Sequence, residues 1–290
     1  MAGLGKGIKI KFKKLKTELE KEGSVLVALS GGVDSSLLAA VSKITLGDKA
    51  MAVTADSVTM TPEELQEAKK FAKSIGIKHL IIKFNELKNS NFIKNPPNRC
   101  YYCKKELASR LRKIAVQKGL RAVVDGTNAD DLKEHRPGAL ALMEKGIISP
   151  LARAGLTKRD IRLLAGALGL STANKPSMAC LSSRFPYGEK ITAKRLLMTA
   201  EAERFIKSLH KFRHLRVRVH GNIARIEVSR SERSFFFSEK LLDTLADGLR
   251  KLGFVYVTMD VEGYRSGSLN ESLNRTIIPN KIWKVKAKEV

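Results

Sequence analysis

Short apolar segments rich in β-branched residues alternate with helical segments through the first half of the chain. The apolar runs are SVLVAL (24–29), AMAVTA (50–55), HLIIKF (79–84) and RAVVDG (121–126). Buried parallel strands have this composition, and consecutive parallel strands are joined by crossover helices. Helices are expected over residues 1–22, 36–44, 61–76 and 104–119, with Thr61 as N-cap and Pro62 in the first position of the third. The alternation predicts an α/β fold in which helices cover both faces of a parallel sheet.

The pattern changes after about residue 190. A helix is expected at 192–209, an antiparallel hairpin around Gly221 and Asn222, a helix at 238–252 and a strand at 254–260. A chain of 290 residues is long enough for two cores. We therefore expect a parallel-sheet domain over 1–188 and a smaller α+β domain over 189–290.

Composition limits the environment of the protein. The net charge of +25 attracts polyanions such as RNA, DNA, nucleotides and phosphorylated metabolites, although the lysines are scattered and most are expected to be solvated. No apolar run is long enough for a membrane span, and the basic start lacks the apolar stretch of a signal peptide. We expect a cytoplasmic homo-oligomer with no membrane contact.

The segment SGGVDSS lies between the first expected strand and the following helix. Its glycines allow a tight turn in which successive N–H groups point at one anion, and the helix N-terminus adds partial positive charge. It is neither a Walker loop, because no G-K-[ST] follows, nor a G-x-G-x-x-G motif. The segment predicts a phosphate cradle formed by Ser30, Gly31, Gly32, Val33, Asp34, Ser35 and Ser36.

Two further segments end expected strands, where ligands of open α/β sheets bind. TADS (54–57), which contains Ala55, ends the second strand, and DGTNADD (125–131) ends the fourth. Asp130 or Asp131 is a candidate Mg²⁺ ligand through its carboxylate. Helix N-capping is the alternative for both aspartates.

The three cysteines form a candidate metal centre. Cys100 and Cys103 make a C-x-x-C pair in a loop expected after the third strand, and Cys180 lies in a loop between Pro176 and Pro186. Three cysteines do not make a disulfide framework. They leave one position open on a metal: His135 could close a zinc site, whereas a [4Fe–4S] cluster would keep one iron free for an external ligand such as sulfide. For Cys180 alone, a small buried hydrophobic residue is the alternative.

The SGGVDSS loop resembles the PP-loop of the ATP pyrophosphatases, which cleave ATP between the α and β phosphates and transfer AMP to a substrate oxygen. Gly126, Thr127 and Asn128 resemble the second nucleotide-contacting loop of that family. The resemblance implies that Ser30 to Ser36, Ala55 and this second loop bind ATP. It also implies that Asp34 is catalytic, through cradle or metal contacts.

The segments NRCYYCK, DGTNADD, HRPGALAL, PSMACLSSRFPYGEKIT and GYRSGSLN together resemble the LarE family, from Ser30 to about Asn270. These enzymes are sulfur transferases of nickel-pincer nucleotide synthesis, which serves the lactate racemase cofactor. The resemblance implies adenylation of the carboxylates of pyridinium-3,5-biscarboxylic acid mononucleotide, followed by conversion to thiocarboxylates. In some members the cysteine matching Cys180 gives up its own sulfur. Members with three matching cysteines are similar to thiolases in which a [4Fe–4S] cluster carries sulfide from an external donor, and we expect this arrangement here.

Three arginines are candidate ligands of substrate phosphate. Arg216 and Arg218 alternate with valines in LRVRVH, which places both guanidinium groups on one face of a strand. LarE relatives carry a matching pair that binds phosphate. Arg184 follows Cys180 by four residues and is the third candidate. A solvated strand face is the alternative for the pair.

Other functions compete with this interpretation. A cluster-dependent tRNA thiolase would share the loop and the cysteines, and the charge favours it. An amidotransferase-type synthetase, such as the ATPase part of GMP or NAD synthetase, would leave the cysteines unexplained. A zinc-stabilised nucleotide-binding module is the non-enzymatic alternative.

Overall fold

The computed structural model describes residues 4–133, 136–176 and 179–274. Contacts divide the chain into two compact units, residues 1–200 and 201–290. The division falls inside helix α9 (Ala193–Leu209), whereas the expected boundary at 188/189 lies just before that helix. The boundary between folding domains therefore stays a prediction.

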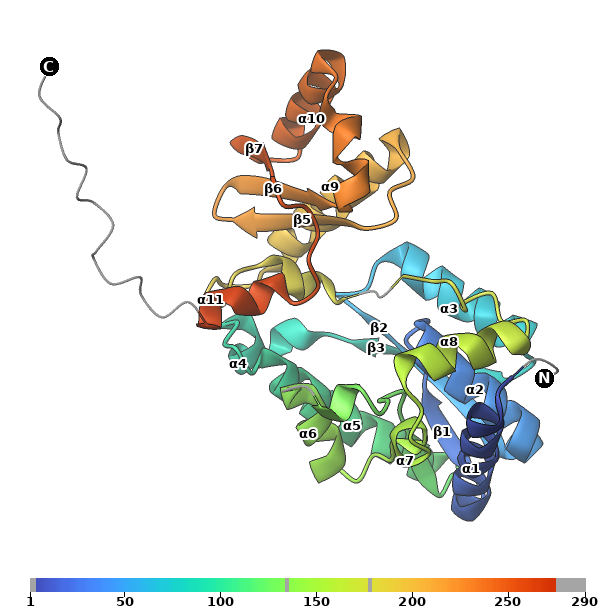
Figure 1. The fold of residues 1–290 in the computed structure, drawn as a ribbon. Helices are drawn as coiled ribbons and strands as arrows, with labels where there is room; N and C mark the ends of the chain where they lie inside the picture. The colour runs from blue at the N-terminus through green and yellow to red at the C-terminus, as the bar shows by residue number, and fades with distance from the viewer. Residues whose placement is uncertain (1–3, 134–135, 177–178, 275–290) are drawn as a thin grey trace, which may run out of the picture. The chain divides into compact units, whose positions relative to one another are not determined.

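The first unit is built around a four-stranded sheet. The strands are β1 (Val25–Ala28), β2 (Ala50–Ser57), β3 (Lys78–Phe84) and β4 (Ala122–Val124), in the order β3-β2-β1-β4 and all parallel. The helices between and around them are α1 (Lys6–Glu22), α2 (Val33–Leu46), α3 (Pro62–Ser74), α4 (Ser90–Ile93), α5 (Arg99–Gln117), α6 (Pro137–Glu144), α7 (Pro150–Arg153) and α8 (Lys158–Ala167). The predicted α/β alternation is confirmed (Figure 1).

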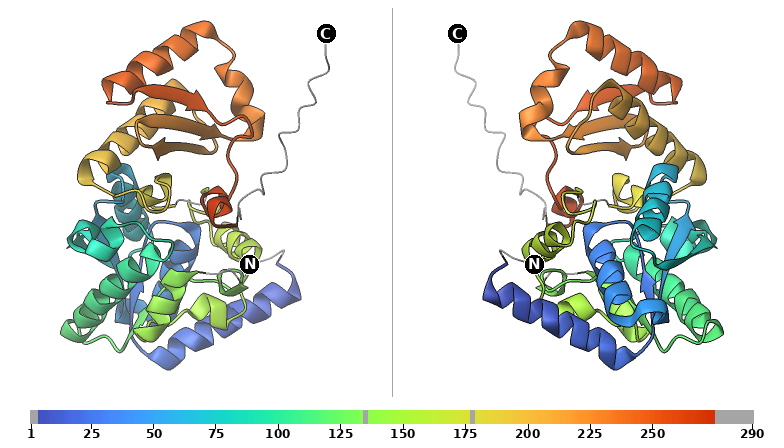
Figure 2. Two further views of the ribbon diagram at one scale, coloured as in Figure 1. Left: turned by 90° about the vertical axis from the view of Figure 1, so that its left-hand side faces the viewer. Right: turned by 90° about the vertical axis from the view of Figure 1, so that its right-hand side faces the viewer.

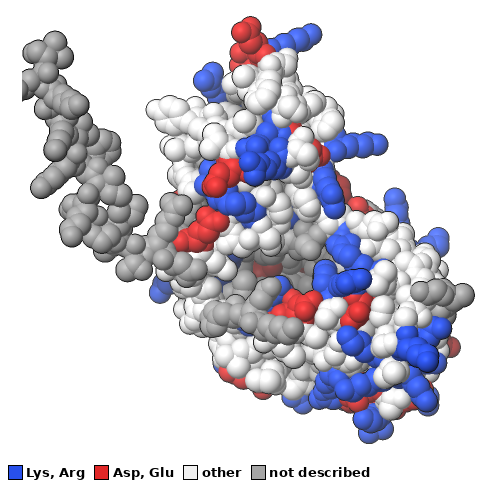
Figure 3. All heavy atoms as spheres, in the orientation of Figure 1, with Lys and Arg blue, Asp and Glu red and all other residues white. Residues whose placement is uncertain are grey.

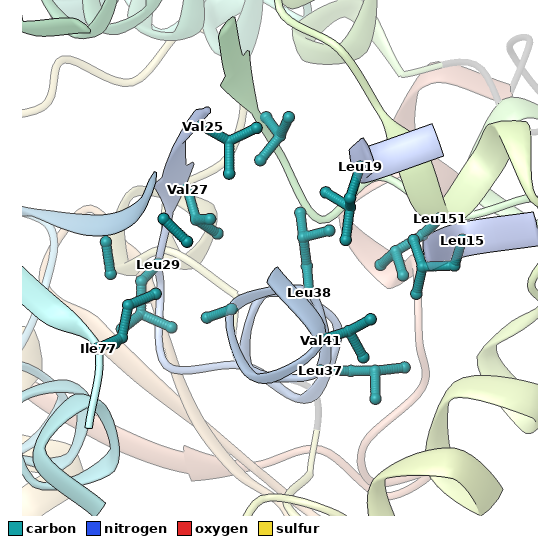
Figure 4. Close-up of a cluster of buried hydrophobic side chains, with 14 of the residues drawn as sticks. Leu15, Leu19, Val25, Val27, Leu29, Leu37, Leu38, Val41, Ile77 and Leu151 are labelled. Carbon is teal, nitrogen blue, oxygen red and sulfur yellow. The ribbon is translucent and has the colours of Figure 1, made fainter. Parts of the chain in front are cut away.

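Both faces of this sheet are buried by helices, as predicted. Val25 and Val27 point to one face and pack in a cluster with α1, α2, α7 and α8 (Figure 4). Leu26, between them, points to the other face and packs with residues of α5 and α6. Side chains alternate between the two faces of a strand, so an apolar run without polar interruptions requires cover on both sides. The side views show helices on either side of the sheet (Figure 2).

Local signals set several element ends. The Thr61 side chain caps α3 and forms a capping box with Glu64, and Pro62 occupies the first turn, as predicted. In the second unit, β5 (Leu215–His220) and β6 (Ile223–Val228) pair antiparallel around Gly221, whose φ is 56°. The predicted hairpin is confirmed. The unit also contains α10 (Glu239–Lys251), β7 (Tyr256–Met259), which pairs parallel with β6, and α11 (Glu271–Asn274).

Two other expectations concern the surface. Within the described part of the chain, no helix has the length and apolarity needed to cross a membrane. Basic side chains are spread over the face seen in Figure 3 and are mixed with acidic ones. This distribution fits the expectation that most lysines are solvated.

Candidate active site

The SGGVDSS segment forms the turn between β1 and α2. Gly31 has a φ of 75°, which favours glycine, and Gly32 is the N-cap of α2. Ser35 ties the turn together: its hydroxyl donates to the Gly32 carbonyl at 3.1 Å and lies 3.1 Å from the Ser30 hydroxyl. The Ser36 hydroxyl is buried and has no hydrogen-bond partner among the described residues. The turn thus presents a helix N-terminus and an unsatisfied buried hydroxyl, which suits an anion.

The loop after β4 lies directly against this turn. A Cβ at Gly126 would lie 2.8 Å from the backbone nitrogen of Ser35, so only glycine allows this approach. Asp125 holds the loop in place, because its carboxylate accepts hydrogen bonds from Thr127 Oγ1 at 2.5 Å and from Ser149 Oγ at 2.6 Å. The two predicted nucleotide-contacting loops are therefore adjacent. Ala55 lies near the carboxyl end of β2, on the strand next to β1.

Polar residues of DGTNADD form hydrogen bonds within their own loop and to helix α8. Asn128 is 2% exposed, and its side-chain oxygen accepts the N–H groups of Asp130 and Asp131. The Asp130 carboxylate accepts the backbone N–H of Lys158, the first residue of α8, at 2.8 Å. Asp130 thus acts in helix capping, which was the alternative to its Mg²⁺ role. The Asp131 carboxylate accepts the backbone N–H of Asn128 at 3.0 Å and pairs with Arg136 at 2.7 Å, and its role as a Mg²⁺ ligand stays a prediction.

Charged groups converge beside the phosphate loop. The Asp34 carboxylate forms an ion pair with Lys158 and accepts a hydrogen bond from the Asn128 amide at 3.4 Å. Burial raises the pKa of Asp131, and the negative charge of Asp34 contributes in the same direction. Both carboxylates contact Asn128, and each has a basic partner, which is Lys158 for Asp34 and Arg136 for Asp131.

Two lysines of this site were absent from the predictions. Lys158 pairs with Asp34, and Lys175 donates to the Gly31 carbonyl at 2.9 Å and pairs with Glu67 at 2.5 Å. Both lysines follow β4 in the sequence, far from the loop that they contact. A lysine at a helix start, as in LTKRD, carries no local signal that distinguishes it from other surface lysines.

The C-x-x-C pair lies in the first turn of α5, and the prediction of a loop at this position is wrong. Pro96 and Pro97 precede the helix and stop it from extending further back, but Cys100 and Cys103 are compatible with its first turn. Residues three apart share one face of a helix, so both thiols are presented together. Cys100 is exposed and Cys103 is half-buried.

Cys180 is held in a loop that closes on the strand ends. The N–H of Leu181 donates to the carbonyl of Thr59, just after β2, at 3.2 Å. The Arg184 guanidinium is 3% exposed and donates to the carbonyls of Ala179 at 2.9 Å and Cys180 at 3.3 Å. Arg184 thus shapes the cysteine loop here, and its contact with substrate phosphate stays a prediction. Cys180 itself is exposed.

The Cys180 thiol is coupled electrostatically to the C-x-x-C pair. Loss of solvent around the sulfur raises the pKa of both Cys100 and Cys103, and the charge of Cys180 contributes in the same direction. Among the residues described, no three His, Cys, Asp or Glu side chains converge as they would around a single ion. His135, the expected closing ligand of a zinc site, lies outside the described residues.

The arginine pair of β5 is buried, so the alternative of a solvated strand face is wrong. Arg216 is 9% and Arg218 is 7% exposed. Arg218 forms an ion pair with Glu227 at 3.0 Å, and Arg216 lies over the ring of Tyr264, 5.4 Å from its centroid. Val217 and Val219 are fully buried on the opposite face. Tyr264, which follows β7, therefore helps to cover the face of β5 on which the arginines lie. The alternating pattern of the sequence alone does not show that this face is covered.

Comparison with known proteins identifies the fold of the first unit and the wider family. Residues 8–173, more than half of the chain, match the NAD synthase family model. The pyridinium-3,5-bisthiocarboxylic acid mononucleotide synthase of Lactiplantibacillus plantarum is 38% identical over 252 residues, which cover 87% of this chain and 90% of that protein. The chain belongs to the LarE family of PP-loop enzymes.

Other relatives agree with this assignment. An uncharacterized protein of Synechocystis is 44% identical over 250 residues, 86% of this chain and 93% of that protein. A tRNA-specific 2-thiouridylase of Rickettsia felis is 30% identical over 195 residues, but the match covers only 54% of this chain. As a LarE homologue with a PP-loop, the protein is an ATP-using sulfurtransferase.

Proposed function

We propose that the enzyme adenylates the carboxylates of pyridinium-3,5-biscarboxylic acid mononucleotide and converts them to thiocarboxylates. The full-length relative from L. plantarum is named for the corresponding bisthiocarboxylic product. A carboxylate oxygen is a poor leaving group, and attachment of AMP turns it into a good one. Ser30 to Ser36 would bind the phosphates, and Asp34 with Asp131 would hold Mg²⁺ beside the departing pyrophosphate.

One observation carries the proposal for sulfur delivery. Cys180 is far from the C-x-x-C pair in the sequence, yet its charge contributes to the raised pKa of both cysteines. The three thiols are in the same unit as the phosphate loop. This donor set fits a [4Fe–4S] cluster, since thiolates are its usual protein ligands. When bound, the cluster would supply a sulfide nucleophile from an external donor, and Cys180 would be a ligand that survives each turnover.

The mononucleotide requires a second phosphate site. Arg216 and Arg218 are the proposed ligands, because a buried arginine keeps its charge and presents several donors to phosphate. Arg218 also pairs with Glu227, and both arginines are candidates for direct contact with the phosphate.

The test is a reaction of anaerobically prepared enzyme with the biscarboxylic mononucleotide, ATP, Mg²⁺ and sulfide. We expect AMP, pyrophosphate and a product whose mass reflects replacement of carboxylate oxygen by sulfur. Formation of ADP and phosphate, or an unmodified mononucleotide, would contradict the proposal. Unmodified tRNA in place of the mononucleotide tests the thiolase alternative, which predicts thiolated nucleoside after digestion.

A further inference from the structure

Lys175, which is not part of SGGVDSS, contacts the backbone of the phosphate loop. Its ammonium donates to the Gly31 carbonyl at 2.9 Å, and its side chain is 15% exposed. The other partner of the ammonium is Glu67 of α3, at 2.5 Å. The Glu67 side chain is 56% exposed, so this ion pair contributes little to stability. The contact with the Gly31 carbonyl is therefore the feature that distinguishes Lys175 from a lysine in a surface ion pair.

The Gly31 carbonyl and the Gly32 N–H belong to one peptide group. This group is planar and trans, so its C=O and N–H point in opposite directions. A hydrogen bond that fixes the carbonyl therefore also fixes the direction of the N–H. Gly32 is the N-cap of α2, and the N–H groups at the start of a helix have no acceptor inside the helix. A phosphate bound at this helix start would supply the acceptor.

This peptide group is the one in the loop that rotates most easily. It joins two glycines, which carry no Cβ and tolerate either sign of φ, and Gly31 has a φ of 75°. Rotation by half a turn would point the carbonyl oxygen toward the anion in place of the N–H. The glycines thus allow the tight turn but do not by themselves hold its orientation. A contact from outside the loop is needed, and Lys175 supplies one.

The segment that carries Lys175 is itself held in place. Arg162 of α8 donates through its two terminal nitrogens to the carbonyls of Ala173 at 2.7 Å and Lys175 at 2.8 Å. These two contacts fix the main chain from which the Lys175 side chain extends. On the other side of the turn, a Cβ at Gly31 would lie 3.5 Å from the Cβ of Ala68 in α3. The turn is therefore enclosed by α3 and the segment after α8.

Building on the function proposed above, we propose that Lys175 is a positioning residue for ATP. Its ammonium holds the Gly31–Gly32 peptide in the orientation in which the Gly32 N–H faces a bound phosphate. A hydrogen bond to the carbonyl also polarises the peptide, which makes its N–H a stronger donor. Lys175 acts through the backbone of Gly31, and the proposal requires no contact between the ammonium and the phosphate.

The test uses the fact that Gly31 and Gly32 are the only adjacent glycines in the sequence. In protein labelled with ¹³C-carbonyl and ¹⁵N glycine, a spectrum that correlates each amide with the preceding carbonyl shows this one peptide. The variants are Lys175→Met, which removes the ammonium, and Lys175→Arg, which keeps a charged donor. Lys43→Met is the matched control, because Lys43 forms an ion pair with Asp48 near the other end of α2 and its side chain is 28% exposed.

We expect Lys175→Met to shift or broaden this peak in the nucleotide-free protein, because the peptide is no longer held. Calorimetric titration with MgATP should show a Kd about tenfold higher than that of the wild type, which is the loss expected for a hydrogen bond from a charged group. Lys175→Arg should recover most of the affinity, since its guanidinium can donate to the same carbonyl. Lys43→Met should match the wild type in both measurements.

Weaker ATP binding in Lys175→Met with an unchanged peak would overturn the inference, because the ammonium would then act on the phosphate directly. Unchanged ATP binding would overturn it as well. Failure of the wild type to bind ATP would instead contradict the nucleotide site of the proposed function. In that case the peak of the nucleotide-free Lys175→Met variant still decides whether Lys175 orients the peptide.

Discussion

Asp34 has two kinds of contact at the start of α2. Its carboxylate pairs with Lys158 and accepts the Asn128 amide, so three segments of the chain meet at this side chain. An exposed ion pair contributes little to stability, and both partners here are only partly buried. The arrangement therefore matters more for placing charge beside the phosphate loop than for holding the fold.

Replacement of Asp34 by Asn should lower kcat for pyrophosphate release about 100-fold, because the cation beside the developing charge loses a ligand. Thermal stability should change little. Asp48→Asn, which removes an exposed ion pair with Lys43, is the control and should keep full activity. Pyrophosphate release is measured at saturating ATP. A wild-type rate in Asp34→Asn would show that the carboxylate is not catalytic.

The cysteines should differ in reactivity when no metal is bound. Only the thiolate is nucleophilic, and burial with the neighbouring thiol raises the pKa of Cys103. We expect iodoacetamide at pH 8 to alkylate Cys180, which is exposed, much faster than Cys103. Peptide mass spectrometry over time measures both rates. Reconstitution with iron and sulfide should protect all three, and protection of none would count against a shared centre.

At the scale of elements, the start of α2 and the loop after β4 pack directly against each other. Gly126 lets the loop approach the Ser35 nitrogen more closely than any side chain allows. Gly126→Ala should separate the two segments, weaken ATP binding at least tenfold and destabilise the protein by about 1–3 kcal/mol. Calorimetric ATP titration and urea denaturation measure the two effects.

A second glycine provides the control for this substitution. Gly166 lies in α8, and a Cβ there would have no neighbour within 4 Å. Gly166→Ala should raise stability by about 0.5–1 kcal/mol through helix propensity and leave ATP binding unchanged. If Gly126→Ala behaved like Gly166→Ala, the close approach of the two loops would not matter for nucleotide binding.

The contacts of Arg216 and Arg218 in β5 predict different effects on stability and on substrate binding when each is replaced by Ala. Arg218→Ala removes one ion-pair partner of Glu227, which is 1% exposed, and leaves its ion pair with Arg225. We expect a loss of about 2–4 kcal/mol in unfolding free energy. Arg216→Ala should cost less stability but weaken mononucleotide binding by about 1.5–3 kcal/mol. Urea denaturation and substrate titration separate these effects, and unchanged substrate binding in both variants would remove β5 from the site.

At the scale of the whole molecule, the fate of Cys180 distinguishes two mechanisms. If a cluster delivers external sulfide, the protein keeps its full mass over many turnovers, and replacement of any one cysteine by Ala abolishes sulfur transfer. If Cys180 gives up its own sulfur, each chain reacts once and loses the mass of H₂S, and Cys100→Ala and Cys103→Ala remain active. Intact-protein mass spectrometry after a reaction with substrate, ATP and sulfide decides between them.

The sequence by itself determined the features that depend on local pattern. The run SVLVAL indicated a strand buried on both faces, and Val25 and Leu26 indeed pack on opposite sides of the sheet. The placement of SGGVDSS between that strand and a helix followed from the same pattern, as did the Thr61 cap and the hairpin at Gly221. Each depends on residues within one or two turns of one another, where periodicity and capping act directly.

Only the tertiary structure decided which distant residues meet. The electrostatic coupling of Cys180 to the C-x-x-C pair and the pairing of Lys158 with Asp34 depend on chain crossings that no local pattern encodes. Burial of the β5 arginines likewise depends on the segment that includes Tyr264. Glu86 is the clearest case: a glutamate after a strand is ordinary in sequence, and only the tertiary structure shows that it is 3% exposed and accepts a hydrogen bond from Thr59, because the burial depends on segments far away in the chain.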